Sequence, residues 1–126
     1  MSLIVQKYGG TSVGSVERIE AVADKIAAFC KKGHEVVVAV SAMSGETNRL
    51  INLAQEVNDN PNRRELDVLL STGEQVSISL LCMALNKRDI QAKSYTGHQV
   101  RILTDNAFGK ARIKDIDSKK IFADLK

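Results

Sequence analysis

The stretch Leu3–Glu17, LIVQKYGGTSVGSVE, decides the fold of this chain. A short apolar run ends at Lys7, two glycines and small hydroxyl residues follow, and a helical pattern then begins. We predict a strand over residues 3–8 and a helix over residues 16–32, because apolar residues in the second range recur at the i, i+3, i+4 spacing of one buried face. Ser15 precedes this pattern as a predicted N-cap.

The next stretch, EVVVAVS at residues 35–41, is β-branched and continuously apolar after its first residue. Such a run is typical of a strand buried on both faces, as in a parallel sheet covered by helices. The chain therefore opens with a strand–helix–strand unit. Beyond it we predict helices over residues 47–57, 64–70 and 74–87, with interruptions at Pro61 and at Ser71–Gly73, a third strand over residues 91–95, a short strand within VRILTD, and a final helix capped by Asp117 or Ser118.

Bulk composition narrows the function classes. The chain has 126 residues, 44% of them hydrophobic, and a net charge of +3. Its basic residues are interspersed with acidic ones and do not interleave with the two Tyr and three Phe, so we expect no nucleic-acid partner. The fully apolar runs fall short of the roughly 20 residues of a membrane span, so we expect no membrane partner. Two isolated cysteines, Cys30 and Cys82, indicate reduced thiols in the cytoplasm, and the scattered His and Cys predict no metal site in this chain.

The paired glycines Gly9 and Gly10 allow two interpretations. A strand that ends in glycines and leads into a helix offers free backbone N–H groups to an anion, and Lys7 adds a positive charge. The same residues also suit a tight turn beside a solvated lysine. The pattern is neither G-x-G-x-x-G nor G-x-x-x-x-G-K-[ST], so spacing alone leaves both interpretations open.

Further candidates follow the other strands. Ser41 lies at the carboxyl end of the second strand, where ligands of open α/β sheets bind, and Thr47 lies at the next helix start. Ser44 and Thr47 could equally be N-caps. Glu74 completes a Ser-x-x-Glu capping box with Ser71, but it also heads a helix that is apolar nearly all round, where a carboxylate needs a partner such as a substrate ammonium group.

Two residues of the loop after the third predicted strand carry weaker signals. His98 is more simply a loop histidine than a catalyst, and Arg101 more simply pairs with a surface carboxylate than with an anionic ligand.

Four segments together resemble the aspartate kinases of the amino acid kinase family. They are KYGGTSVG, VVVAVSAMSGETNRL, STGEQVS and SYTGHQVRILTD, and they occur in the order and spacing of that family. The resemblance covers essentially all 126 residues. It implies an α/β fold, namely the N-terminal portion of a three-layer αβα sandwich with a mainly parallel sheet.

The resemblance also implies a reaction, the ATP-dependent phosphorylation of the β-carboxylate of L-aspartate on the route to lysine, threonine and methionine. By similarity, Lys7 is catalytic and stabilises the transferring phosphoryl group, while Thr47 and Glu74 bind aspartate. The residues implied to contact the ATP phosphates are Lys7, Tyr8, Gly9, Gly10 and Ser41. ATP and Mg²⁺ are the implied cofactors, and we expect a homo-oligomer for the full-length protein.

The chain departs from the family in length. A kinase domain of this family is about twice as long, so we interpret residues 1–126 as a truncated, substrate-side lobe without the nucleotide-binding half and the regulatory domains. We expect this piece alone to be inactive. Two alternatives remain: a family member with another acceptor (glutamate, acetylglutamate or uridylate), and a non-catalytic binding or regulatory module.

Overall fold

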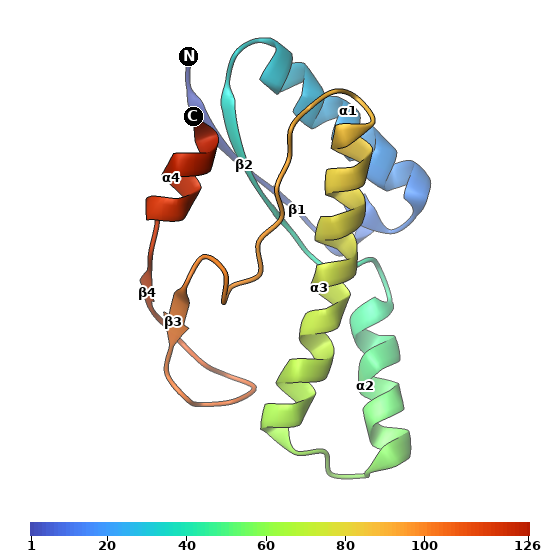
Figure 1. Cartoon of the computed structure of the whole chain (residues 1–126). Helices are drawn as coiled ribbons and strands as arrows, with labels where there is room; N and C mark the ends of the chain where they lie inside the picture. Colours follow the sequence, from blue (N-terminus) through green and yellow to red (C-terminus); the bar gives the residue numbers. More distant parts are fainter.

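β1 (Leu3–Tyr8) and β2 (Glu35–Val40) form the predicted parallel pair in a computed structural model that describes residues 1–126. Their register runs from Leu3 opposite Glu35 to Tyr8 opposite Val40. A parallel pair requires a crossover, and α1 (Val16–Lys31) supplies it. A short 3₁₀ helix, η1 (Gly10–Val13), precedes α1. Figure 1 labels the remaining elements: α2 (Glu46–Val57), α3 (Arg63–Asn86), β3 (Ile102–Thr104), β4 (Ile113–Ile116) and α4 (Lys119–Leu125).

The first helix forms as its sequence predicts. The Ser15 hydroxyl accepts a hydrogen bond from the Arg18 N–H at 3.2 Å, which satisfies one of the unpaired donors of the first turn. Glu17 lies in that turn, where it faces the positive end of the helix dipole. After the C-terminal end, Gly33 adopts φ +88°, a left-handed conformation that glycine adopts without strain.

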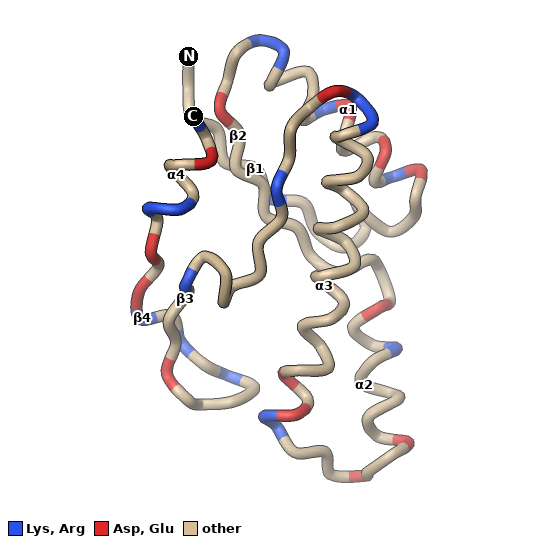
Figure 2. The backbone as a smooth tube through the Cα atoms, viewed as in Figure 1, with Lys and Arg blue, Asp and Glu red and all other residues tan.

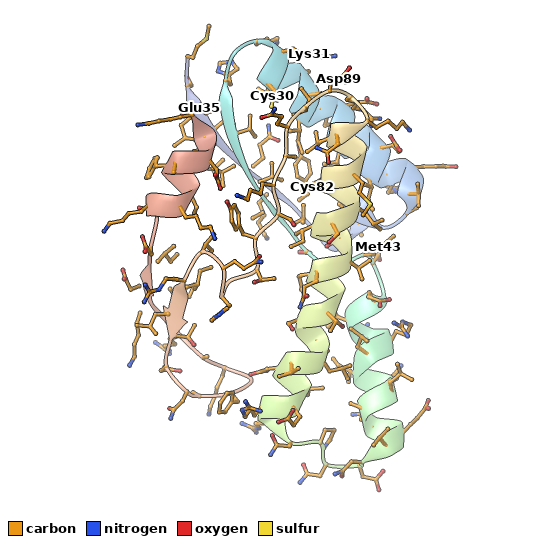
Figure 3. All side chains as sticks on the ribbon, in the orientation of Figure 1. Cys30, Lys31, Glu35, Met43, Cys82 and Asp89 are labelled. Carbon is orange, nitrogen blue, oxygen red and sulfur yellow. The ribbon has the colours of Figure 1, made fainter.

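The hydrophobic core lies between α1 and α3. α1 turns its apolar face toward α3, and partly buried side chains of β2 pack against the same cluster. The fully packed members are Val13, Ile19, Val22, Ala23, Ile26, Leu81, Ala84 and Leu85. The two predicted thiols are indeed unpaired: Cys30 of α1 and Cys82 of α3 (Figure 3) are half-buried, and burial raises the pKa of each.

The predicted interruption at Ser71–Gly73 is wrong, because α3 is one continuous helix. The Ser71 and Thr72 hydroxyls each donate to a carbonyl three residues earlier, both at 2.7 Å, so these residues satisfy their polar groups within the helix. The predicted capping box is therefore also wrong, and Asn62 is the actual N-cap of α3. Within this structure the helix is not buried all round, since Met83 is 64% and Val76 46% exposed.

The predicted third strand is wrong as well. Residues 91–95 form no strand, and β1 and β2 pair only with each other, so each keeps one free edge. The short strand expected in VRILTD does form, as β3, but it pairs antiparallel with β4, which the sequence did not predict. The final helix begins at Lys119, and the Asp117 carboxylate accepts from the Lys119 N–H at 3.1 Å.

Two further surface properties bear on partners. Lys/Arg and Asp/Glu segments alternate along the backbone in Figure 2, without a continuous basic stripe. α3 has the length and composition that a membrane crossing requires, although a core helix of a soluble protein can share both properties. In this structure α3 contacts α1 and α2 along its length. Its small and buried residues, such as Gly73 and Ser77, face protein.

Candidate functional site

The carboxyl ends of β1 and β2 lie next to each other. Tyr8 and Val40 are opposite in the register, and the Ser41 N–H donates to the Tyr8 carbonyl at 3.1 Å, which extends the pairing by one residue. The loop after β1 (residues 9–14) and the loop after β2 (residues 41–45) therefore begin side by side. This edge is where open α/β sheets bind their ligands.

The two adjacent glycines differ in their surroundings. A side chain at Gly10 would place its Cβ 3.0 Å from the Ala42 carbonyl oxygen, so only glycine lets the two loops approach this closely. Gly9 is exposed and has open space around its Cα. Lys7 is exposed on the same strand end. Gly10 thus allows the close turn, while the anion site at Gly9 and Lys7 stays a prediction.

α3 closes the other side of the β2–α2 loop. A Cβ at Gly73 would lie 3.1 Å from the Ala42 Cβ and 3.5 Å from the Glu46 Cγ. One turn later, the Ser77 hydroxyl donates to the Ser41 carbonyl at 2.8 Å. Figure 3 labels Met43 in this loop, beside α3. The predicted residues Ser41, Thr47 and Glu74 are therefore carried by three segments that converge.

The side chains of the predicted site remain free. Lys7, Thr47 and Glu74 are all exposed, and no ion pair joins Lys7 to Glu74. No residue of this chain forms an ion pair with Glu74. We expected Glu74 to need a partner because it would head a buried helix, but it lies in the middle of α3 and is exposed. The structure thus brings together the backbones that carry the predicted residues without linking the side chains.

Tyr8 contributes its backbone to this edge more than its side chain. The Tyr8 hydroxyl donates to the Gln6 side-chain oxygen at 2.9 Å, within the same strand, and burial raises its pKa. The Tyr8 carbonyl is the group that joins the two strand ends.

Neither Ser44 nor Thr47 is the N-cap of α2. That position belongs to Gly45, which has φ +82° and offers no side-chain acceptor. The first turn instead holds Glu46, whose carboxylate binds Arg49 at 2.7 and 3.0 Å. The hydrogen bonds from Arg49 hold the pKa of Glu46 below its usual range. The strand ends are thus bordered by the start of α2, which has no side-chain N-cap, and by Arg49, which is paired with Glu46.

Sequence reasoning missed several of these residues. Gly73 was hidden because it fell in the supposed helix break, whereas Ser77 lay inside the helix predicted over residues 74–87. Their spacing of four residues on one small-residue face was the available signal. The Glu46–Arg49 pair has the i, i+3 spacing of a helical ion pair, which was equally visible.

His98 and Arg101 lie apart from this edge. They border an open cavity of about 590 Å³ on the β3–β4 ribbon, which no residue of the two strand-end loops lines. Neither residue gains a role in the candidate site. The structure contains no group of three or more His, Cys, Asp or Glu side chains that could hold a metal ion.

Comparisons with known proteins agree with this geometry. The model of the amino acid kinase family matches residues 2–125. The chain is 66% identical over 126 residues to the aspartokinase of Pseudomonas aeruginosa, covering 100% of this chain and 31% of that protein. It is 56% identical over 118 residues to aspartokinase 2 of Bacillus subtilis, covering 94% of this chain and 29% of that protein. The chain therefore spans about a third of the length of the curated relatives it matches.

Two solved structures share the fold. The aspartate kinase from Synechocystis superposes with a TM-score of 0.75 at 59% identity, over 78% of this chain and 17% of that one. Aspartokinase III of E. coli, solved in complex with aspartate and ADP, superposes with a TM-score of 0.83 over 98% of this chain and 38% of that one, at 22% identity. The expected α/β fold is confirmed, and the chain belongs to the amino acid kinase family.

Proposed function

We propose that the protein to which this chain belongs transfers the γ-phosphoryl group of ATP to the β-carboxylate of L-aspartate. One observation carries the proposal: the glycine loop after β1 packs on the loop after β2, and it leaves Lys7 and Gly9 exposed at the shared strand edge. Relatives named aspartokinase, 66% and 56% identical, support the choice of aspartate.

The residue roles follow from the chemistry of each group. Exposed backbone at Gly9, with the neighbouring Tyr8, Gly10 and Ser41, suits phosphate oxygens, and the Lys7 ammonium suits the charge that develops on the transferring group. Thr47 lies in the first turn of α2, where backbone N–H groups favour an anion such as a substrate carboxylate.

Glu74 is the group that selects the acceptor in this proposal. Its carboxylate is exposed on α3, has no ion-pair partner in the chain, and complements the free ammonium group of aspartate. An N-acetylated acceptor and uridylate both lack that ammonium group.

The reaction needs no general base from the protein. The attacking β-carboxylate has a reference pKa of about 3.9 and is already ionised at neutral pH. The γ-phosphorus–oxygen bond to ADP breaks as the carboxylate oxygen bonds to phosphorus, so the products are ADP and an acyl phosphate. Catalysis then rests on positioning and charge stabilisation. Mg²⁺ would arrive bound to the phosphates of ATP and neutralise part of their charge, with protein ligands outside these 126 residues.

The wider context is part of the same proposal. The product would enter the synthesis of lysine, threonine and methionine, and the protein would act in the cytoplasm as a homo-oligomer. The free thiols of Cys30 and Cys82 suit a reducing compartment. The 126-residue piece alone would be inactive, because it lacks most of the length of its relatives.

A hydroxamate assay on the natural gene product tests the proposal. MgATP is supplied with L-aspartate, L-glutamate, N-acetyl-L-glutamate or uridylate in turn. Hydroxylamine traps acyl phosphates, and ADP release follows the uridylate reaction. We expect a signal with L-aspartate only. Activity with N-acetyl-L-glutamate or uridylate would overturn the roles of Thr47 and Glu74, since neither acceptor has a free ammonium group. Activity with L-glutamate would overturn the choice of aspartate, and inactivity with all four would overturn the kinase proposal.

A further inference from the structure

We propose that Ser77 is a positioning residue, whose hydroxyl ties the turn of α3 that carries Glu74 to Ser41, the first residue after β2. This inference rests on the proposed function, in which Ser41 contacts phosphate and Glu74 holds the substrate ammonium group. Ser77 itself touches neither ligand, since it has no exposed surface.

The hydrogen bond of Ser77 leaves its own helix. Its Oγ lies 2.8 Å from the Ser41 carbonyl oxygen and 3.1 Å from the Glu74 carbonyl oxygen. A hydroxyl has one proton, and the shorter distance assigns it to Ser41. Ser77 therefore bonds directly to the backbone of one proposed ligand residue and lies one helical turn from the other.

The other hydroxyl residues of α3 behave differently. Ser71, Thr72 and Ser79 donate to the carbonyls of Val68, Leu69 and Gln75, and each of these bonds stays within the helix. Such back-bonding satisfies a polar side chain but fixes nothing beyond the helix. Ser77 is the hydroxyl of α3 that donates outside the helix, to the loop after β2.

Gly73 completes the contact one turn earlier. It is buried, and a Cβ there would lie 3.1 Å from the Ala42 Cβ. Gly73 and Ser77 are four residues apart and share one face of α3. We call these two residues the α3 seam: the absence of a side chain at Gly73 sets how closely α3 approaches the loop, and the Ser77 bond fixes its position.

The α3 seam explains how Glu74 can be exposed to solvent and still have a fixed position relative to Ser41 and Thr47. Successive residues of a helix are offset by about 100°. Glu74 therefore projects from the flank of the seam, away from the packed contact with Ala42. A shift of α3 along the loop would therefore move Glu74 relative to Ser41 and Thr47, even if none of these three residues is substituted.

The test compares Ser77→Ala with Ser79→Ala in the natural gene product. Both variants remove one hydroxyl from α3, but only the first removes the bond to the Ser41 carbonyl. We measure kcat, the KM for L-aspartate and the melting temperature. We also follow amide exchange in the peptide over residues 41–47, with residues 16–31 as the internal reference.

We expect Ser77→Ala to raise the KM for L-aspartate about ten-fold, the scale of one lost buried hydrogen bond, while Ser79→Ala leaves it unchanged. Exchange over residues 41–47 should quicken in Ser77→Ala alone. Loss of folded enzyme would lower kcat without moving KM, so an unchanged KM would overturn the proposal even if kcat falls.

Two further outcomes are decisive. If Ser77→Ala does not fold, Gly73→Ala displaces the same seam while keeping the hydroxyl, and an unchanged KM in that variant would overturn the proposal. If the wild-type protein phosphorylates no acceptor, the proposed function fails separately. The exchange result then decides the positioning role: faster exchange over residues 41–47 supports it, and unchanged exchange rejects it.

Discussion

Residues 1–90 and residues 91–126 differ in how they are held together. The first region contains the whole hydrophobic core between α1 and α3. In the second region Val100 is the one buried residue, every residue of β4 is exposed, and α4 buries nothing. Apolar side chains such as Ile113 and Phe122 remain 62% and 52% exposed. The candidate site therefore lies in residues 1–90, the region that contains the hydrophobic core.

The largest expected effect concerns catalysis. In the natural gene product, Lys7→Met should lower kcat by about 100-fold or more, the cost of losing one charge-stabilising group from the transition state. Lys114→Met removes a lysine of β4 that is also exposed, and it should leave kcat unchanged. Steady-state kinetics with MgATP and L-aspartate measures kcat for both variants. Equal losses in both variants would mean that the second region also carries the site.

The next effect concerns the core. Ile26 is 2% exposed, so Ile26→Ala should lower the free energy of unfolding by about 2–5 kcal/mol. Ile113→Ala makes the same truncation at a residue 62% exposed and should change it by less than about 0.5 kcal/mol. Urea unfolding followed by circular dichroism measures both. A large loss for Ile113→Ala would show that β4 is covered in solution.

A smaller effect separates two glycines of similar conformation. Gly33 has φ +88° and Gly109 φ +82°, so alanine at either position is strained by about 1–2 kcal/mol. At Gly33 this strain should appear in full in the free energy of unfolding, because the turn joins α1 to β2. At Gly109 the sparsely packed ribbon can open locally, so the loss should be less than half as large. Equal losses would contradict the division into two regions.

The smallest effect concerns ion pairs. Arg88, which follows α3 and donates to its Ala84 carbonyl, pairs with Glu20 of α1 at 2.6 Å and Asp24 of α1 at 2.7 Å. Lys93 pairs with Asp124 at 3.5 Å. Arg88→Ala should lower the melting temperature more than Lys93→Ala does, and added salt should reduce the difference.

The Arg88 pair also predicts a pH dependence. Hydrogen bonds from Arg88, and then from Lys87, hold the pKa of Glu20 below its usual range. A carboxylate whose pKa is lowered by folding stabilises the folded state at pH values above its unfolded pKa of about 4.3. This stabilisation is lost as the pH falls and the carboxylate becomes protonated in the folded state. The melting-temperature gap between wild type and Arg88→Ala should therefore narrow below about pH 4. A gap that stays constant down to pH 2 would exclude Glu20 as its source.

The sequence predicted the elements whose signals are local. The strand at residues 3–8, the helix that begins after Ser15 and the parallel pairing of the first two strands all follow from periodicity, a cap and an apolar run. Their signals suffice because each element is amphipathic or continuously apolar. The prediction that the second strand is buried on both faces is nevertheless wrong, since no residue of β1 or β2 is buried.

The errors share a physical cause: whether a segment forms a helix or a strand depends on the groups that it bonds to or packs against in the folded chain. Ser71 to Gly73 look like a helix break, but two hydroxyls bond back into the helix and the glycine meets Ala42. Residues 91–95 have strand-like residues but pair with neither free strand edge, so no ladder forms. The candidate site shows the same limit: Lys7 and Gly9 could be selected from the sequence, whereas Ser77 matters only through a carbonyl 36 residues away.

The free edges of β1 and β2 have a consequence for biosynthesis. In relatives of which this chain covers 31%, the matching region is the N-terminal part and leaves the ribosome first. Unpaired backbone on both strands, with Val5 70% exposed, is then open to strand addition by another nascent chain. Because a polysome holds several copies of the nascent chain close together, it would favour this edge-to-edge association.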